Sequence, residues 1–485
     1  MITRRHVLKL SAAAAAAFGA FPPVLQAQPL PLRRSIHEID LDDPVLASLR
    51  DFVTQMKDSA RDGQPVSWVS FANIHGTNAG FNLCPHGNWY FLPWHRAYLQ
   101  MYEAAVRDVT GNAAFAMPYW DWNAHPEFPA AFGDPTFDGQ PNPLFVPDRL
   151  MSTGDAIPPN VAGDAIIESI MEKATFEEFG SSRANGQDGT DPSWIGRRGV
   201  EGQLESTPHN LIHCRIRGPF MCAGTSPQDP IFQMHHCNID RIWDAWNRAG
   251  GLNTTNTFWT DMVFADHFID PTGAQYSRTV KELLDVAPLG YAYIPEPKPA
   301  LEPGPISNPG RELFLSLLFG APIALEAGFV APTLKAGSVT ATPDRPANAT
   351  LDIAALDGGM MAALEAGGMA GGAKLFLRRI MPDAPETTEL RVFVNAPDAN
   401  ANTPTADNPN FVTSIGFFGI GPGGTMQMEG HDGMEGMEPS VQIDLPKEGL
   451  ALGGETVTLQ LVSVALAEGD AAGTVTVTEV ELAVV

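Results

Sequence analysis

Histidine is the residue whose spacing in this sequence most clearly predicts chemistry. Nine of the twelve histidines lie between His75 and His267. They include a first group (His75, His86 and His95) and a second group (His209, His213 and the adjacent pair His235 and His236). His209 and His213 are four positions apart, so on a helix both imidazoles point the same way and can reach one metal ion. Imidazole clusters without clustered carboxylates favour copper or zinc over magnesium, calcium or a di-iron site.

A single histidine pair at this spacing is also common on helix surfaces, so the pair alone is a weak signal. The zinc-protease motif H-E-x-x-H is excluded, because Asn210 follows His209 where that motif needs a glutamate. The combination of two groups with aromatic flanks is what favours a metal centre. From the residues alone, His235 and His236 remain alternatives for the last ligand.

Three longer strings surround these histidines. They are CPHGNWYFLPWHR, LESTPHNLIH and DPIFQMHHCNIDRIW. Together they resemble the type-3 copper proteins, which comprise tyrosinases, catechol oxidases and haemocyanins. The resemblance implies two copper ions, the first held by His75, His86 and His95 and the second by His209, His213 and His236. It also implies that the copper pair uses dioxygen to hydroxylate monophenols and to oxidise o-diphenols to o-quinones.

Residues beside the ligands are expected to support them. Asp240 lies one helical turn after His236, where we expect it to accept a hydrogen bond from an imidazole N–H. Phe232, four residues before His236, is expected to stack on the ligand rings, or simply to pack in the core. In fungal and molluscan relatives a cysteine placed like Cys84 forms a thioether to the ligand histidine, here His86; the alternative is a free buried thiol.

The other three cysteines flank the second histidine group. Cys222 could form a disulfide with either of its neighbours, Cys214 or Cys237, and the sequence does not choose between them.

The choice between a tyrosinase and a catechol oxidase depends on three further residues. By resemblance, Glu205 and Asn210 hold and orient a water that accepts the proton of a monophenol; for Glu205 the alternative is a helix-capping role. Ala223 matches the position of a substrate gate that is a bulky phenylalanine in many catechol oxidases. A small gate favours monophenols, so we expect a tyrosinase. A catechol oxidase and an o-aminophenol oxidase are the alternatives, and a non-enzymatic dioxygen carrier is disfavoured.

The periodicity changes along the 485 residues, a length that suggests two or three domains. Helical spacing of apolar residues occurs over 44–57, 89–106 and 231–247, whereas alternation over 390–394, 456–462 and 474–482 predicts strands. We therefore expect a mainly α catalytic domain over 28–295, a four-helix bundle around the dicopper site. A proline-rich linker over 296–334 and a C-terminal β-sandwich shielding domain over 335–485 should follow it.

The chain begins like an exported protein. Arg4 and Arg5 precede a short alanine-rich run, so residues 1–27 are predicted to be a twin-arginine signal peptide that directs the protein to the periplasm or the outside. The net charge of −26 disfavours nucleic acid and anionic membranes as partners. The expected partners are a phenolic substrate, O₂ and an activating protease, and the oligomeric state stays open.

The tail resembles the C-terminal domain of plant polyphenol oxidases, most clearly at LRVFVNAP (residues 390–397). That resemblance implies a latent enzyme, opened by tail removal, detergent or acid. Tyr291 and Tyr293 match a tyrosine motif that closes the catalytic domain, and we expect them to pack on Arg34. The methionine-rich stretch 426–437 is either a Cu(I)-holding arm or an exposed low-complexity loop.

Overall fold

The computed structural model describes residues 30–294, 333–354, 373–421, 438–445 and 456–484. The predicted export signal, nearly all of the proline-rich linker and the methionine-rich stretch lie outside these ranges. They stay predictions. Among the described helices, none is long and apolar enough to cross a membrane.

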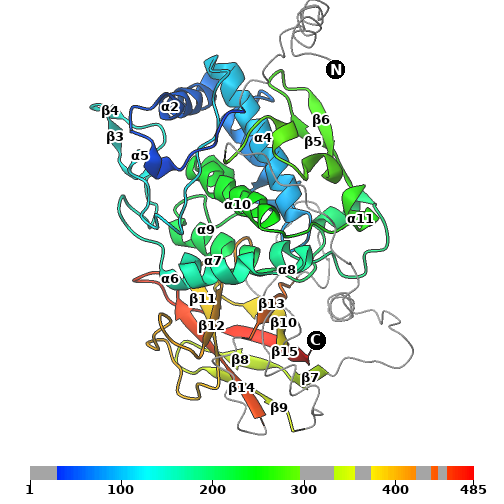
Figure 1. Ribbon diagram of the computed structural model, residues 1–485. Coiled ribbons are helices and arrows are strands. Elements are labelled where there is room, and N and C mark those ends of the chain that lie inside the picture. Colours follow the sequence, from blue (N-terminus) through cyan, green and yellow to red (C-terminus); the bar gives the residue numbers. More distant parts are fainter. Residues whose placement is uncertain (1–29, 295–332, 355–372, 422–437, 446–455, 485) are drawn as a thin grey trace, which may run out of the picture.

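Residues 30–294 form a mainly helical unit (Figure 1). Its helices are α2 (Pro44–Met56), α3 (Trp68–His75), α4 (Phe91–Thr110), α5 (Ala130–Gly133), α6 (Pro159–Ala162), α7 (Asp164–Met171), α8 (Phe176–Gly180), α9 (Asn210–Ile216), α10 (Ile231–Arg248) and α11 (Thr257–Thr260). Three short hairpins accompany them: β1 (Gly76–Thr77) with β2 (Gly80–Phe81), β3 (Thr136–Phe137) with β4 (Gln140–Pro141), and β5 (Val263–Ile269) with β6 (Gln275–Thr279). The three helices predicted from periodicity correspond to α2, α4 and α10, so these predictions are confirmed.

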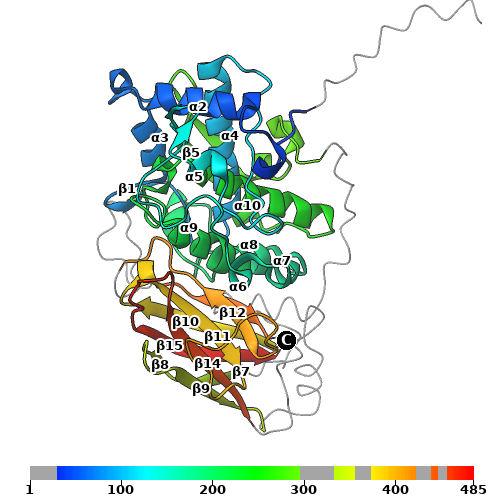
Figure 2. The ribbon, with the colours of Figure 1, turned by 90° about the vertical axis from the view of Figure 1, so that its left-hand side faces the viewer.

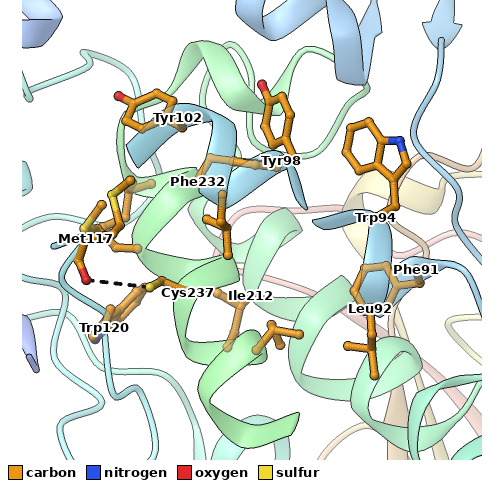
Figure 3. Packing of buried hydrophobic residues seen from close by; sticks show 14 of the residues in the cluster. Phe91, Leu92, Trp94, Tyr98, Tyr102, Met117, Trp120, Ile212, Phe232 and Cys237 are labelled. Carbon is orange, nitrogen blue, oxygen red and sulfur yellow. Dashed lines mark hydrogen bonds between the residues drawn. The ribbon is translucent and has the colours of Figure 1, made fainter. Parts of the chain in front are cut away.

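Local sequence signals explain where the helices begin and end. Asp43 caps α2 by accepting a hydrogen bond from the Val45 N–H, and Pro44 occupies the first turn, where no N–H is needed. Gly111 ends α4 in the left-handed conformation with φ 70°. Helices α4 and α10 pack against each other in the centre of the unit. Figure 3 shows Tyr98 of α4 beside Phe232 of α10, with ring centroids 6.0 Å apart.

The C-terminal part is a β-sandwich, which confirms the predicted fold class. One antiparallel sheet has the order β13-β10-β15-β7 with β8 also paired to β15, and the other has the order β12-β11-β14-β9. The strands are β7 (Thr333–Ala336), β8 (Val339–Ala341), β9 (Ala347–Asp352), β10 (Ala373–Pro382), β11 (Thr388–Val394), β12 (Phe411–Ile415), β13 (Val441–Asp444), β14 (Thr456–Ala465) and β15 (Val475–Val484). Alternate residues of the sheets meet in a separate apolar core, as the strict alternation in β9 illustrates.

The sandwich lies against α6–α9 of the helical unit (Figures 1 and 2). Hydrogen bonds and ion pairs connect the two parts, and two apolar side chains of the sandwich, Phe418 and Leu466, join the core of the helical unit. Asn160 donates to Glu389 at 2.8 Å, and the Gly416 N–H donates to the Ser206 carbonyl at 2.9 Å. Lys173 of the helical unit forms an ion pair with Asp444 of the sandwich. Several polar groups of the sandwich are therefore paired with polar groups of the helical unit across the interface.

Candidate metal centre

Four segments bring the two histidine groups together. His75 is the last residue of α3, His86 lies in the loop before α4, and His95 lies on α4; together with Cys84 their ligand atoms all lie within 4.8 Å of one another. The second group has the same spacing and consists of His209, His213, His235 and His236, which come from the segment before α9, from α9 and from α10. All of these side chains are buried.

The first helical segment of the second group is irregular for a reason that is visible in the sequence. Residues Glu205–His209 form a π-helical turn that contains Pro208. Because proline has no N–H, a regular helical bond cannot form there, and the Asn210 N–H donates instead to the carbonyl of Glu205, five residues back. This wider turn leads directly into α9 and sets His209 against His213, with ring centroids 4.6 Å apart.

Oxygen acceptors fix the tautomer of most ligands. Nδ1 of His75 donates to the Gly224 carbonyl at 2.7 Å, and Nδ1 of His95 donates to the Phe91 carbonyl at 2.8 Å. In the second group, Nδ1 of His213 donates to the Met221 carbonyl at 2.8 Å and Nδ1 of His209 to the Asn210 side-chain oxygen at 2.9 Å. An imidazole that donates from Nδ1 presents the lone pair of Nε2 to a metal ion.

The inner nitrogens have the properties of metal ligands. Nε2 of His75 and Nε2 of His209 are buried without a hydrogen-bond partner, which is costly unless a metal ion satisfies them. Burial lowers the pKa of His75 to about 3, and burial followed by the neighbouring His95 holds the pKa of His236 well below its usual value. The imidazoles are therefore neutral, as metal binding requires. The residues fit a pair of metal ions.

The two groups face each other closely. The His95 and His236 rings stack with centroids 4.2 Å apart, and the His86 and His209 rings lie 5.6 Å apart. Nε2 of His236 lies 3.0 Å from Nε2 of His213, as expected for two ligands of one ion. His235 also reaches this group, and neither of its nitrogens has a hydrogen-bond partner. Both His235 and His236 therefore lie within reach of this group, and the assignment of the last ligand to His236 stays a prediction.

Aromatic rings enclose the imidazoles. Phe232 contacts the His236 ring at a centroid distance of 4.2 Å and the His75 ring at 5.2 Å. Two further rings were not singled out from the sequence: Phe81 stacks on His86 at 4.2 Å, and Phe91 contacts His209 at 4.6 Å. Phe81 is the last residue of β2 and Phe91 begins α4, so only the fold brings them to the site. These rings keep water away from the centre.

The cysteines separate into two kinds. Cys214 and Cys222 form a disulfide, whereas Cys84 and Cys237 are free and buried. The Sγ atom of Cys84 lies 3.6 Å from Nδ1 and 3.9 Å from Nε2 of His86, and 3.2 Å from Nε2 of His95. This geometry is compatible with the expected thioether. The bond itself stays a prediction, which the mass of a peptide containing both residues would test.

Asp240 does not contact an imidazole, so the predicted partner was wrong. Its carboxylate accepts hydrogen bonds from Arg96 at 2.5 Å, from the hydroxyls of Tyr291 at 2.7 Å and Tyr293 at 2.6 Å, and from Arg33 at 3.2 Å. The reason is geometric: α10 turns Asp240 towards the N-terminal segment, where two buried guanidinium groups need a counter-charge. Asp240 therefore ties the ends of the helical unit together behind the ligand helix.

The arginine that packs on the tyrosine motif is Arg33 and not Arg34. The Arg33 guanidinium lies 3.4 Å from the centre of the Tyr291 ring and is buried. Arg34, which is one residue further along the extended segment, points to the surface and pairs with Asp43 at 2.8 Å. In an extended chain neighbouring side chains point to opposite sides, so an error of one position reverses the outcome.

The expected base residues lie beside the second group, but they contact different partners. Glu205 accepts hydrogen bonds from the Gly87 N–H at 2.7 Å and from the Ser181 hydroxyl at 2.5 Å. Burial, and secondly the charge of Glu201, raise the pKa of Glu205 to about 8. The direct carboxylate partner of Asn210 is Glu201, at 3.2 Å. Glu201 was missed, because nothing in its local sequence distinguishes it.

A side chain of the C-terminal sandwich enters the centre. The Phe418 ring stacks on His213 with centroids 4.0 Å apart and lies 5.2 Å from His86 and 5.4 Å from His209. Phe418 is 2% exposed, so it fills the space above both groups. Next to it, a cavity of about 460 Å³ is lined by residues of both parts of the chain, among them Phe81, Ala223 and Gly419. Ala223 therefore lines this cavity, and its role as a substrate gate stays a prediction.

The comparisons with known proteins agree with this geometry. The family described as common central domain of tyrosinase matches residues 65–194 and 147–249, which include all the histidines of both groups. Over these residues the chain is similar to the tyrosinase family. Both histidine groups lie within the matched residues, and their composition is consistent with a pair of copper ions.

Related sequences cover part of the chain. A tyrosinase from Hahella sp. (strain CCB-MM4) is 32% identical over 312 residues, which are 54% of this chain and 63% of that protein. The chloroplastic (+)-larreatricin hydroxylase of Larrea tridentata is 32% identical over 262 residues, 47% of this chain and 43% of that protein. The chain thus spans roughly half the length of these relatives, from 43% to 63%.

Solved structures extend the likeness to the whole fold. A latent apple tyrosinase has a TM-score of 0.62 at 20% identity and covers 96% of this chain and 99% of that one. A recombinant latent aurone synthase (polyphenol oxidase) has a TM-score of 0.62 at 19% identity and covers 96% of this chain and 91% of that one. At this identity the likeness concerns the fold: a helical unit followed by a C-terminal β domain.

Proposed function

We propose that this chain oxidises phenols with O₂ at a copper pair, and that it hydroxylates monophenols as well as oxidising o-diphenols. Two facing groups of buried, neutral imidazoles with unpartnered inner nitrogens are the observation that carries the proposal. When bound, a copper pair supplies the dioxygen chemistry, since imidazole accommodates both Cu(I) and Cu(II). His75, His86 and His95 would hold one ion, and His209, His213 and His236 the other.

Glu205 is the residue to which we assign proton transfer. It is buried one helical turn before His209, and its raised pKa of about 8 makes it a stronger base than an ordinary carboxylate. Asn210 holds the Nδ1 proton of His209 through its side-chain oxygen. A small residue, Ala223, at the approach supports access for a monophenol ring.

The replacement Glu205→Gln tests this assignment, made in a chain opened by Phe418→Ala and loaded with copper. Glutamine retains an oxygen for the Gly87 N–H and can pair with the Ser181 hydroxyl, so the fold should persist. We expect tyrosine hydroxylation to fall by about a hundredfold or more, while catechol oxidation changes only a few-fold, because catechol needs less help from a base. Initial rates on tyrosine and catechol in parallel measure this.

The same assay separates the alternatives. Equal losses on both substrates would refute proton transfer by Glu205. Activity of the opened parent on catechol alone would make it a catechol oxidase, and activity on o-aminophenol alone an o-aminophenol oxidase. An opened, copper-loaded chain that oxidises none of the three substrates would refute the proposed function.

We also propose that the full chain is latent. Phe418 occupies the space where a substrate ring would meet the imidazoles, and its loop is fixed to the helical unit by the Gly416 N–H, which donates to the Ser206 carbonyl at 2.9 Å. The Asn210 amide also donates to the Gly416 carbonyl at 3.3 Å. A substrate therefore needs this segment of the sandwich to move.

Ion pairs make the docking of the sandwich sensitive to acid. Burial alone would raise the pKa of Asp444, but the ammonium groups of Lys173 and Lys374 outweigh it and hold that pKa below its usual value. Glu178, on α8, faces Lys374 at 2.5 Å. Burial would also raise the pKa of Glu389, but the charges of Arg215 and Arg391 outweigh it and hold that pKa below its usual value. A carboxylate with a lowered pKa stabilises the docked state above its unfolded pKa, and this stabilisation disappears as the pH falls.

We therefore expect brief exposure to a pH below about 4, where unfolded Asp and Glu begin to protonate, to activate the full chain. Activity on catechol, measured after return to neutral pH, should rise, and Asp444→Asn should shift the onset towards higher pH. Glu468→Gln, which changes an exposed carboxylate of the same sandwich, is the control and should leave the onset unchanged. An onset that is identical in the parent and in Asp444→Asn would contradict this role of Asp444.

A further inference from the structure

One short loop orients a ligand in each histidine group. This loop, residues 217–224, follows α9 and contains the Met221 carbonyl, which accepts from Nδ1 of His213 at 2.8 Å. It ends with the Gly224 carbonyl, which accepts from Nδ1 of His75 at 2.7 Å. Because these acceptors aim the two Nε2 atoms at the centre, a displaced loop would misorient one imidazole of each group.

Close packing fixes the far end of the loop to the hairpin that follows His75. A Cβ atom added to Gly224 would lie 2.8 Å from the Gly80 carbonyl oxygen, and one added to Gly76 would lie 2.7 Å from the Gly224 oxygen. Only glycines permit this approach of two backbones. The loop thus spans from one ligand group to the other without intervening side chains at that end.

The near end of the loop begins with an unfavourable backbone conformation. Arg217 has φ 42°, which residues with a Cβ rarely adopt, and Gly218 follows with φ 59°. Such a conformation persists only where the surroundings impose it. Two separate connections do so here.

The first connection is covalent and lies within the helical unit. The disulfide joins Cys214, which follows His213 in α9, to Cys222, which follows Met221 in the loop. Both cysteines are buried. The disulfide therefore links α9 to the loop directly beside the hydrogen bond from His213 to the Met221 carbonyl.

The second connection comes from the C-terminal sandwich. The Arg217 guanidinium donates two hydrogen bonds to the carboxylate of Asp470, at 2.8 and 2.7 Å. Asp470 lies between β14 and β15, and its carboxylate also accepts a hydrogen bond from the Ala467 N–H at 3.0 Å. Displacement of the sandwich, which the proposed function requires, would remove this connection and leave the first.

We propose that Cys214 and Cys222 are positioning residues whose disulfide keeps His213 and His75 aligned for copper when the sandwich no longer holds the loop. The inference rests on the copper ligation of the proposed function. In the docked chain either connection suffices, because both hold the same loop. In the opened chain the disulfide remains as the connection that holds the near end of the loop, beside the Met221 carbonyl.

The experiment uses four full-length, copper-loaded chains: the parent, Asp470→Asn, Cys214→Ser with Cys222→Ser, and all three changes together. The measurement is the rate of copper loss to a strong chelator, together with copper per chain. We expect each partial variant to remain within a few-fold of the parent, and the combined variant to lose copper about tenfold to a hundredfold faster, as is typical when a partner of metal ligands is removed. A combined effect equal to the product of the separate effects would overturn the inference.

A matched ion pair serves as the control. Glu479 pairs with Lys335 at 3.1 Å on the same sandwich but does not contact the loop. Glu479→Gln added to the cysteine replacements should leave copper loss unchanged. A disulfide that only stabilised the fold would lower the unfolding temperature of the copper-free chain without making copper loss depend on Asp470, so both quantities are compared.

A second measurement remains decisive if the cysteine replacements prevent folding. Hydrogen exchange of the Met221 and Ala223 amides, which donate within the loop at 2.9 and 3.1 Å, is followed in the parent and in Asp470→Asn. With the disulfide intact, exchange should be unchanged, and exchange faster by about tenfold would overturn the inference, since it would report local opening. Neither measurement involves a phenol, so a chain that retains copper but oxidises no substrate would refute the proposed function alone.

Discussion

Replacing Phe418 with alanine is expected to raise the activity of the full-length, copper-loaded chain on catechol by about a hundredfold. The ring lies 4.0 Å from the His213 ring and has the size of a substrate ring, so its removal frees the position that a substrate needs. Truncation of a buried phenylalanine removes roughly 3 kcal/mol of the packing that holds the ring over the site. Because about 1.4 kcal/mol corresponds to a factor of ten, a loss of this size matches an increase of about a hundredfold. Initial rates at neutral pH, without protease, detergent or acid, are the measurement.

Two companion variants make this result specific. Phe418→Leu leaves a bulky side chain in place and should give a much smaller increase. Ile420→Ala enlarges the neighbouring cavity, which Ile420 lines, and leaves the Phe418 ring in place. The activity of this variant should remain near that of the parent. A parent that is already as active as Phe418→Ala would show that the ring does not block the site. An equal increase in Ile420→Ala would assign the effect to loosening of the loop instead.

The second large effect concerns the adjacent histidines on α10. His236→Ala is expected to lose the second copper ion and to reduce phenol oxidation by about a thousandfold, which matches several kcal/mol of lost metal stabilisation. Nε2 of His236 lies 3.0 Å from Nε2 of His213, and the His236 ring stacks on His95 of the other group. The neighbouring replacement, His235→Ala, should retain close to the parent's copper and activity. Copper per chain and initial rates on catechol are measured for both.

The comparison is balanced because both replacements remove a fully buried imidazole from the same helix. Differences between the variants therefore report on ligation and not on helix stability. Loss of copper in His235→Ala, with retention in His236→Ala, would exchange the assignment. Equal loss in both would mean that the second ion has four imidazoles around it, which the grouping of all four nitrogens within 4.8 Å would then explain.

The sequence predicted what local patterns determine. The periodicity of apolar residues located α2, α4 and α10 and the strands β11, β14 and β15, because helices and strands bury one face at a fixed spacing. The histidine groups could also be predicted from the sequence, since their residue type and spacing already limit the chemistry. The β-sandwich and the mainly helical unit followed from the same alternation.

Contacts between distant segments could not be predicted in this way. Phe418 lies in a Gly-Phe-Phe-Gly turn that resembles many others, and only the docking of the sandwich brings it to His213. Glu201 joins Asn210 across a turn, and its importance depends on that geometry. The choice between Arg33 and Arg34 depended on which side of an extended segment faces inward, for which one residue of error is decisive. The hydrogen-bond partner predicted for Asp240 was wrong because its actual partners, such as Arg33, come from distant segments of the chain.

The polar docking surface has a consequence for the opened protein. Loss of a covering domain commonly exposes an apolar surface, which promotes aggregation. Here the uncovered faces carry groups such as Asn160, Arg215 and Lys173 on one side and Glu389, Asp444 and Asp470 on the other. Water can hydrate each of these groups once the partner has gone. Separation would therefore expose these hydratable groups together with the Phe418 ring, and not a wholly apolar surface.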